Sequence, residues 1–274
     1  MSVTITAADI NKLRQTTGAG MLDCRKALTE SNGDFEAAID WLRKQGQKVA
    51  AKRSDREAKE GVVIAQTTAD GKSGIVLCIS CETDFVSKNA DFVAFAQSIA
   101  DAAIANNVKT AEELNGVTVN GATVEQLIND KLAAIGEKIA VSKFERVDAP
   151  YVASYIHGAN RMGVLVSMTK EAAEAGKDVA MQIAAMNPLA VDETSISQET
   201  KDREKAIAIE MIKAEGKPAE MAEKIADGKM NRFFKDNTLM AQAFVKDNSK
   251  SVADYLKSID ADLKVTDFKR VALG

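Results

Sequence analysis

The segment GVVIAQTTADGKSGIVLCISC, residues 61–81, decides the fold class of this chain. Its runs GVVIAQTT and GIVLCISC are rich in β-branched residues with a period of two, and ADGKS between them is typical of a turn. We therefore predict an antiparallel β-hairpin. A helix is predicted directly after it, because Phe92, Phe95 and Ile99 fall on one helical side.

The same order of elements returns about 90 residues later in the chain. YVASYI, the turn HGANRM and GVLVSM predict a second hairpin, and KDVAMQIAAM predicts the helix after it. Between the two units, TVEQLINDKLAAIGEKIAVSKFERV predicts a helix and then a strand. Because strand, turn, strand and helix occur twice, we predict an α+β fold with two related subdomains and antiparallel sheets, at residues 61–148 and 149–274.

The first part of the chain, residues 1–46, predicts a module of three short helices. Thr6 and Asp9 form a capping-box pattern before the first helix, and Asp34 can cap the third. The residues of the third helix that share one apolar face are Phe35, Ala38, Ile39 and Leu42. Residues 47–60 are charged and rich in alanine without a strong apolar face, which indicates a linker that can be helical.

A helical hairpin is predicted from about residue 195 to 235, inserted in the second subdomain. We expect Gly216 to end its first helix and Pro218 to start its second. The residues expected to face one way on the two arms are Ala208, Met211 and Ile212, and then Ala222, Ala226, Met230, Phe233 and Phe234. These faces can close on each other or serve as an arm for docking or dimerisation. The tail predicts one more helix and a final strand.

Composition and charge narrow the classes of function. Hydrophobic residues make up 46% of the 274 residues, which is ordinary for a globular protein. Lys and Arg number 36 against 40 Asp and Glu, so the net charge of −4 argues against nucleic acid as a direct partner. The sequence shows neither a signal peptide nor an apolar stretch of the ~20 residues that span a bilayer. We therefore expect a cytoplasmic protein without a membrane partner.

Signatures of catalysis are missing from the sequence. His157 is the only histidine, no phosphate-binding P-loop occurs, and GAGMLD lacks the third glycine of a dinucleotide fingerprint. We expect no covalent reaction, no metal site and no cofactor of its own. The C-x-x-C pair Cys78 and Cys81 lies at the end of a predicted strand, where residues i and i+3 point to opposite faces. This placement favours structural cysteines over a redox or metal pair.

The stretch CETDFVSKNADFVAFA, residues 81–96, leaves two interpretations of Phe85 open. Phe85 lies seven residues before Phe92, so one helix through both would bury Phe85 in the core. Thr83 and Asp84, however, are typical of caps and turns, which favours a bend between strand and helix. The pattern alone favours the core. His157 is interpreted, from pattern alone, as a turn residue with local hydrogen bonds.

Five stretches together resemble the elongation factor Ts family: LRQTTGAGMLDCRKALTESNGDFEAAIDWLR, CETDFVSKN, AAIGEKI, SYIHGANRMGVLV and EGKPAEMAEKIADGKMNRFFKD. They follow the family's order over nearly the whole chain. The resemblance implies a translation elongation factor that binds elongation factor Tu with GDP and promotes the exchange of GDP for GTP. It also implies a ubiquitin-associated-like three-helix module, a linker, two α+β subdomains and a protruding helical hairpin.

The resemblance implies site residues position by position. The family's Thr-Asp-Phe-Val motif intrudes into the partner's nucleotide domain and displaces Mg²⁺, and it stands here as Thr83, Asp84, Phe85 and Val86. The positions that match the contacts of the N-terminal module with that domain are Arg14, Met21 and Leu22. The positions that match contacts with the partner's third domain are Ile135 and His157.

The resemblance also implies the state of Phe85 in the free protein, the use of cofactors and the oligomeric state. On this view Phe85 is exposed in the free protein, and the factor acts on GDP and Mg²⁺ bound to its partner without a cofactor of its own. A homodimer within a heterotetramer is compatible with the resemblance.

Two other classes of protein stay open from the residues alone. One is a generic interaction scaffold, in which the three-helix module binds a helix or a ubiquitin-like partner. The other is a thiol-redox protein that uses Cys78 and Cys81. Neither accounts for the ordered series of matching stretches.

Overall fold

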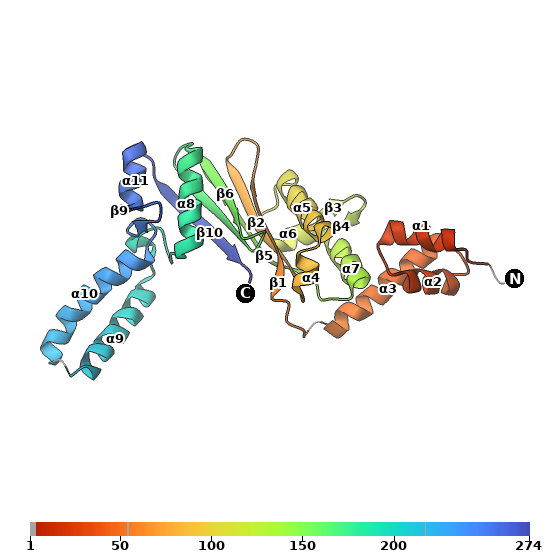
Figure 1. The fold of residues 1–274 in the computed structure, drawn as a ribbon, viewed down its shortest axis with the longest axis horizontal. Coiled ribbons are helices and arrows are strands. Elements are labelled where there is room, and N and C mark those ends of the chain that lie inside the picture. Colours follow the sequence, from red (N-terminus) through yellow and green to blue (C-terminus); the bar gives the residue numbers. More distant parts are fainter. Residues whose placement is uncertain (1–3, 54, 217) are drawn as a thin grey trace.

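The computed structural model describes residues 4–53, 55–216 and 218–274, so Ser54 of the predicted linker and Lys217 of the predicted hairpin turn lie outside the described residues. The described chain is elongated (Figure 1). A three-helix module lies at the end that carries the N-terminus, antiparallel sheets with their helices occupy the middle, and a helical hairpin projects at the other end. The predicted α+β fold class is confirmed.

The N-terminal module consists of α1 (Ala7–Thr17), α2 (Met21–Glu30) and the first part of α3 (Phe35–Arg53). The predicted capping box is present, because the Thr6 hydroxyl accepts the Asp9 N–H and the Asp9 carboxylate accepts the Thr6 N–H. The buried residues of this small core are Leu13, Ala19, Cys24, Ala27, Leu28, Ala38 and Leu42.

Helix α3 runs past residue 46 and carries the beginning of the predicted linker as helix, through Arg53. It packs against α7 (Val124–Ile135) of the first subdomain. Gly46 marks the close approach, since a Cβ placed there would lie 2.8 Å from the Cβ of Ala133. Val49 packs against the core of the first subdomain. The module is therefore joined to the sheets by a packed helix.

The first sheet contains β1 (Glu60–Thr67), β2 (Ser73–Cys81) and β5 (Ala140–Asp148), in the order β1-β2-β5. Side chains alternate across it, as a period of two requires. Val62 and Ile64 face the core under α5 (Ala90–Ala105) and α7, and Val63 faces the other way. The pattern did not predict α6 (Ala111–Gly116) or the short hairpin of β3 (Thr118–Val119) and β4 (Ala122–Thr123).

The second sheet repeats this arrangement with β6 (Tyr151–His157), β7 (Met162–Met168) and β10 (Val265–Ala272), in the order β10-β7-β6. Helix α8 (Ala173–Met186) covers its outer face. In both sheets the third strand pairs antiparallel with the second strand of the hairpin. The two predicted hairpin-and-helix units are therefore present and share one topology.

The inner faces of the two sheets pack against each other. The buried residues between them are Val63, Ala65, Val76, Cys78, Val147, Val152, Leu165 and Val271. Two glycines permit this approach. A Cβ at Gly163 would lie 2.9 Å from side-chain atoms of both Val63 and Val76, and one at Gly74 would lie 2.8 Å from Val152.

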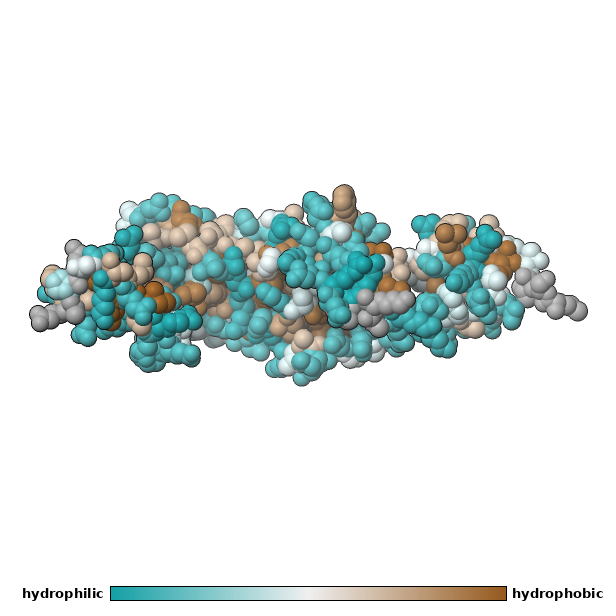
Figure 2. Space-filling view, turned by 90° about the horizontal axis from the view of Figure 1, so that it is seen from below, coloured by the Kyte–Doolittle hydropathy of each residue, from teal (hydrophilic) through white to brown (hydrophobic). Residues whose placement is uncertain are grey.

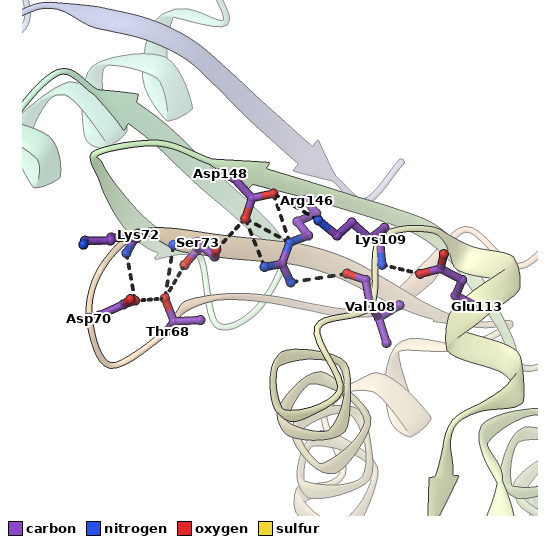
Figure 3. Close-up of polar contacts among 9 residues, drawn as sticks. All are labelled: Thr68, Asp70, Lys72, Ser73, Val108, Lys109, Glu113, Arg146 and Asp148. Atoms are coloured by element: carbon purple, nitrogen blue, oxygen red, sulfur yellow. Dashed lines mark hydrogen bonds and ion pairs between the residues drawn. The ribbon is translucent and has the colours of Figure 1, made fainter.

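The end of β5 is tied to its neighbours by polar contacts (Figure 3). The nearly buried guanidinium of Arg146 donates to Asp148 at 3.0 Å and to the carbonyl of Val108 at 3.4 Å. Asp148 also accepts the Ser73 hydroxyl from the start of β2. These bonds from Arg146 hold the pKa of Asp148 below its usual value. The network links the β1–β2 turn, β5 and the segment after α5.

The helical hairpin consists of α9 (Gln198–Ala214) and α10 (Ala219–Asn237), with Gly216 in the left-handed conformation and Pro218 before α10, as predicted. The two arms close on each other through Ala208, Ile212, Ala222 and Ala226. Met211 was expected on this face, but it is exposed because it lies on the outer side of α9.

The remaining elements connect the hairpin to the second sheet. They are the 3₁₀ turn Glu193–Ser195, β8 (Ala243–Phe244), β9 (Asp247–Ser251) and α11 (Val252–Ile259). The predicted helix and final strand of the tail are α11 and β10. Within the described residues, no helix combines the length and apolar character of a membrane span.

Candidate functional site

Phe85 stands out because its side chain is 84% exposed. It lies on α4 (Asp84–Ser87), a four-residue helix between the end of β2 and the start of α5. The interpretation of Phe85 as core is therefore wrong, and the expectation of exposure is confirmed. The physical reason is a break between two helices: Asn89 caps α5 through its side chain, so Phe85 and the buried Phe92 do not share one helical face.

The residues around Phe85 are anchored, so its exposure is not that of a loose loop. Val86 packs against the first core, and Ser87 is buried, with its hydroxyl donating to the carbonyl of Asp84 at 3.2 Å. On the other side, the Cys81 thiol donates to the carbonyl of Thr83 at 3.2 Å. We call residues Thr83–Val86 the wedge. It presents one large apolar ring from a fixed main chain.

Asp84 places a negative charge beside the ring of Phe85. Its carboxylate accepts the Lys88 ammonium at 2.6 Å, and this hydrogen bond lowers the pKa of Asp84. Both side chains are well exposed, so the pair is accessible to a partner and contributes little to stability. Asp84 is ionised at neutral pH.

Thr83 is held by Glu137, which lies in the loop after α7. The Glu137 carboxylate accepts the N–H of Glu82 at 3.1 Å, the N–H of Thr83 at 3.0 Å and the hydroxyl of Thr83 at 2.7 Å. The stretches CETDFVSKN and AAIGEKI, which are far apart in the sequence, therefore meet at the wedge.

Glu82 makes the reciprocal contact. Its carboxylate accepts the N–H of Lys138 at 2.6 Å, Arg53 at 2.7 Å and Arg56 at 3.1 Å. The bond from the Lys138 N–H, followed by those from the two arginines, lowers the pKa of Glu82 to about 2. Arg53 is the last residue of α3, so the linker is bound to the residue that precedes the wedge.

Glu82 and Glu137 are the residues that the sequence analysis missed. Both stand inside stretches already quoted for the family resemblance, but hydrophobic periodicity gives no weight to a carboxylate at the end of a strand or helix. A signal was present in Gly136, whose left-handed conformation ends α7 and turns the chain toward β5. A glutamate directly after such a turn is free to contact a neighbouring segment.

The structure places the other predicted residues on α7, on the N-terminal module and at the end of β6. Ile135 is the last residue of α7, two positions before Glu137, and is 37% exposed. The α1–α2 loop approaches this point, since a Cβ at Gly18 would lie 4.0 Å from the Cβ of Ala134.

This loop leads to Met21 and Leu22 in the first turn of α2, which are 47% and 79% exposed. Arg14 in the last turn of α1 is also exposed. Viewed from below, the surface is mostly hydrophilic, and hydrophobic atoms lie in separate patches that include one on the N-terminal module (Figure 2).

His157 is the last residue of β6 and does not lie in the turn itself. It is exposed, and its Nδ1 lies 3.0 Å from the hydroxyl of Tyr155, so the expected local hydrogen bond is present. The following turn contacts the start of β1, because Arg161 pairs with Glu60 at 3.0 Å. Glu60 pairs across the sheet with Cys81. The turn after His157 therefore lies at the same end of the first sheet as the wedge.

The cysteines do not form a reactive pair. Cys78 faces the core between the sheets, and Cys81 faces the core under α5 and α7. Both are buried, and burial raises the pKa of each thiol, that of Cys81 to about 12 with a further contribution from the nearby carboxylates of Glu137 and Glu60. Among the described residues, no three His, Cys, Asp or Glu side chains are grouped so that they could hold a metal ion.

Fold and site together define a modular α+β protein that presents apolar side chains from a small helical module and from a fixed wedge. Residues 82–274 match the sequence model of the family described as "Elongation factor TS". The chain is also 51% identical to the elongation factor Ts of Christiangramia forsetii, over 98% of this chain and 99% of that protein. Identity to the elongation factor Ts of Flavobacterium psychrophilum is 51% over 99% of both chains. Identity to the elongation factor Ts of Cytophaga hutchinsonii is 48% over 99% of both chains. The chain belongs to the elongation factor Ts family.

Proposed function

We propose that this chain binds elongation factor Tu with GDP and promotes the exchange of GDP for GTP by inserting Phe85 into the nucleotide domain of the partner. The observation that carries the proposal is the 84% exposure of Phe85 on a turn whose neighbours are buried or hydrogen-bonded. Single exposed apolar side chains are common on protein surfaces, so the support comes from the anchored main chain around Phe85 and from its place in the matched motif Thr83–Val86. Membership of the elongation factor Ts family supports elongation factor Tu as the partner.

The energetics require contacts beyond the wedge. A GTPase that holds GDP with nanomolar affinity has a binding free energy of about −12 kcal/mol. Burial of one phenylalanine contributes about 1.5–3 kcal/mol, which speeds release but does not replace GDP. The remaining binding energy comes, in this proposal, from Arg14, Met21 and Leu22 on the nucleotide domain and from Ile135 and His157 on the third domain.

In this proposal, exchange results from thermodynamic linkage between two ligands of elongation factor Tu, the nucleotide and this protein. In a GTPase, Mg²⁺ neutralises the charge of the nucleotide phosphates. The wedge carries the negative charge of Asp84 beside Phe85. In this proposal it disturbs the Mg²⁺ site of the partner and thereby weakens the binding of GDP to the partner. The coupling is reciprocal, so a bound nucleotide lowers the affinity of the partner for this protein by the same factor by which this protein lowers the affinity for that nucleotide. Rebinding of GTP therefore releases this protein from the partner. The factor catalyses no covalent reaction of its own and needs no cofactor, since it acts on the GDP and Mg²⁺ of its partner.

The setting of this function follows from the same partner. We place the protein in the cytoplasm, where translation occurs, without direct contact to nucleic acid or membrane. A homodimer within a heterotetramer with elongation factor Tu is compatible with the proposal.

The test is release of a fluorescent GDP analogue from elongation factor Tu, followed by stopped flow as the concentration of this protein is varied. We expect the release rate to rise by orders of magnitude and to saturate. The same preparation should form a complex with nucleotide-free elongation factor Tu that GTP dissociates. Release at the spontaneous rate, with no complex on a sizing column, would refute the function.

A further inference from the structure

Phe85 depends for its position on the main chain around it. Its own side chain is exposed, so no packing of the ring fixes it in the free protein. Downstream of Phe85, Val86 and Ser87 are held by the first core. Upstream, Glu82 and Thr83 lie beyond Cys81, which forms the last residue pair of the β1–β2 ladder with Glu60. Apart from the bond that the Cys81 thiol donates to the Thr83 carbonyl, the upstream half therefore takes its support from outside the sheet.

Glu137 provides this support. Its two carboxylate oxygens accept three hydrogen bonds from the Glu82–Thr83 segment, at 2.7–3.1 Å. Two of the donors are main-chain N–H groups beyond the last residue pair of the β1–β2 ladder, and the third is the Thr83 hydroxyl. Hydrogen bonds that involve an ionised group are stronger than those between neutral groups. Glu137 thus fixes the start of the wedge through its bonds to Glu82 and Thr83.

The loop that carries Glu137 is held in return by Glu82. The Glu82 carboxylate accepts the N–H of Lys138, the residue after Glu137, and is itself fixed by Arg53 and Arg56. The Glu82 side chain is only 14% exposed, so salt screens its bonds from Lys138 and Arg53 less than it screens an exposed ion pair, whereas the Arg56 side chain is 58% exposed. The two glutamates therefore hold each other's segment in place.

We propose that Glu137 is a positioning residue for Phe85 and that Glu82 positions the loop that carries Glu137. This inference rests on the proposed exchange function. It assigns to these carboxylates the task of presenting the wedge in its binding conformation before the partner arrives. A binding element that is fixed in advance loses less conformational freedom on association than a mobile one.

The experiment compares Glu137→Ala with Glu137→Gln in the full-length protein. A glutamine can accept both main-chain N–H groups with its carbonyl oxygen and donate from its amide to the Thr83 hydroxyl, which is also an acceptor. Alanine can do neither. Glu125→Ala, on the exposed side of the first turn of α7, is the matched control. For Glu82→Ala the control is Glu57→Ala, an exposed glutamate that pairs only with Lys59 among the described residues.

The first readout needs no partner. Amide hydrogen exchange of residues 82–86 should become about tenfold faster or more in Glu137→Ala, as the loss of one or two hydrogen bonds predicts, and Glu82→Ala should follow the same direction. The rate in the middle of β2 should not change. Glu137→Gln and the two controls should stay near the wild type. Unchanged exchange at residues 82–86 in Glu137→Ala would overturn the proposal.

The second readout is release of fluorescent GDP from elongation factor Tu, arranged as a double-mutant cycle with Phe85→Ala. Glu137→Ala should lower the rate about tenfold with Phe85 present. In the Phe85→Ala background, the same change should alter the rate by no more than about twofold, because Glu137 acts through Phe85. Equal losses in both backgrounds would show a separate role and overturn the proposal. If the wild type itself fails to release GDP, the proposed function fails, while the hydrogen-exchange result still decides the role of Glu137 in holding the wedge.

Discussion

Two phenylalanines seven residues apart should respond to truncation in opposite ways. Phe85 is 84% exposed and Phe92 is 2% exposed, although both belong to one short stretch of sequence. Phe85→Ala removes a ring that touches little in the free protein, so its effect on the free energy of unfolding should stay within about 0.5 kcal/mol. Phe92→Ala opens a cavity in the first core and should cost about 3–5 kcal/mol.

For the rate of GDP release from the partner, Phe85→Ala should have the larger effect and Phe92→Ala the smaller one. Burial of the Phe85 ring in a partner is worth about 1.5–3 kcal/mol, and each 1.36 kcal/mol in a barrier is a factor of ten. Phe85→Ala should therefore slow GDP release from elongation factor Tu by about 10–160-fold. Phe85→Leu, which keeps part of the apolar area, should lie between alanine and the wild type. Phe92→Ala should retain most of its activity at temperatures where it is folded.

The assay pairs stopped-flow release of fluorescent GDP with the thermal midpoint of the free protein. For a chain of this size, Phe92→Ala should lower the midpoint by about 6–20 °C, and Phe85→Ala should leave it within about 2 °C. A large fall in the midpoint of Phe85→Ala would mean that the ring is buried in solution. A release rate within twofold of the wild type would mean that the ring does not enter the partner. Either result would refute the reasoning.

Four further predictions follow from other residues. Cys78 and Cys81 should resist iodoacetamide at pH 8 and react only after unfolding, because both are buried and the pKa of Cys81 is raised to about 12; mass spectrometry showing rapid labelling of the native protein would contradict this. The pKa of Glu82 is lowered from 4.5 to about 2, so its contribution to stability is complete above pH 4.5 and is lost as the pH falls toward 2. The difference in urea midpoint between wild type and Glu82→Gln should accordingly shrink on acidification. A difference that stays constant with pH would show that the ionised Glu82 carboxylate does not stabilise the folded protein. Gly163→Ala should cost about 1–3 kcal/mol in urea unfolding, because its Cβ would press on side chains of the facing sheet, and an unchanged midpoint would show that the sheets can separate without cost. Leu22→Ala should raise the concentration of half-maximal exchange about tenfold without moving the thermal midpoint, since Leu22 is 79% exposed, and equal curves for mutant and wild type would remove it from the contact surface.

Much of the fold could be predicted from the sequence because local patterns and final packing agree. The hairpin at β1 and β2 follows from a period of two on both sides of a polar turn, and burial of alternate residues against helices and facing sheet then stabilises the same structure. Gly216 and Pro218 likewise mark the ends of α9 and α10 because each suits the main-chain conformation required there.

Phe85 shows where periodicity fails. Its spacing from Phe92 matches one helical face, but Asn89 begins a new helix and the phase is lost. Met211 fails for a different reason, because α9 contacts α10 through Ala208 and Ile212 with Ile209 packed beside them, and Met211 lies outside this contact. The resemblance to a family corrected the first of these interpretations. It could not reveal Glu82 and Glu137, whose contacts join segments more than fifty residues apart.

Helix α3 joins two proposed binding surfaces, the N-terminal module and the wedge, so the proposed interaction is bivalent. Its 19 residues span about 28 Å, and it runs from the N-terminal module to the subdomain that carries the wedge, where Gly46 lets it lie close against α7. Once one of these two surfaces has engaged a partner, the other meets its target as an intramolecular step. For tethered sites, such a step corresponds to an effective concentration in the millimolar range, and avidity can exceed either separate affinity by about 10²–10⁴. A spacer that is packed rather than loose restricts this gain to partners whose two target sites have the matching separation.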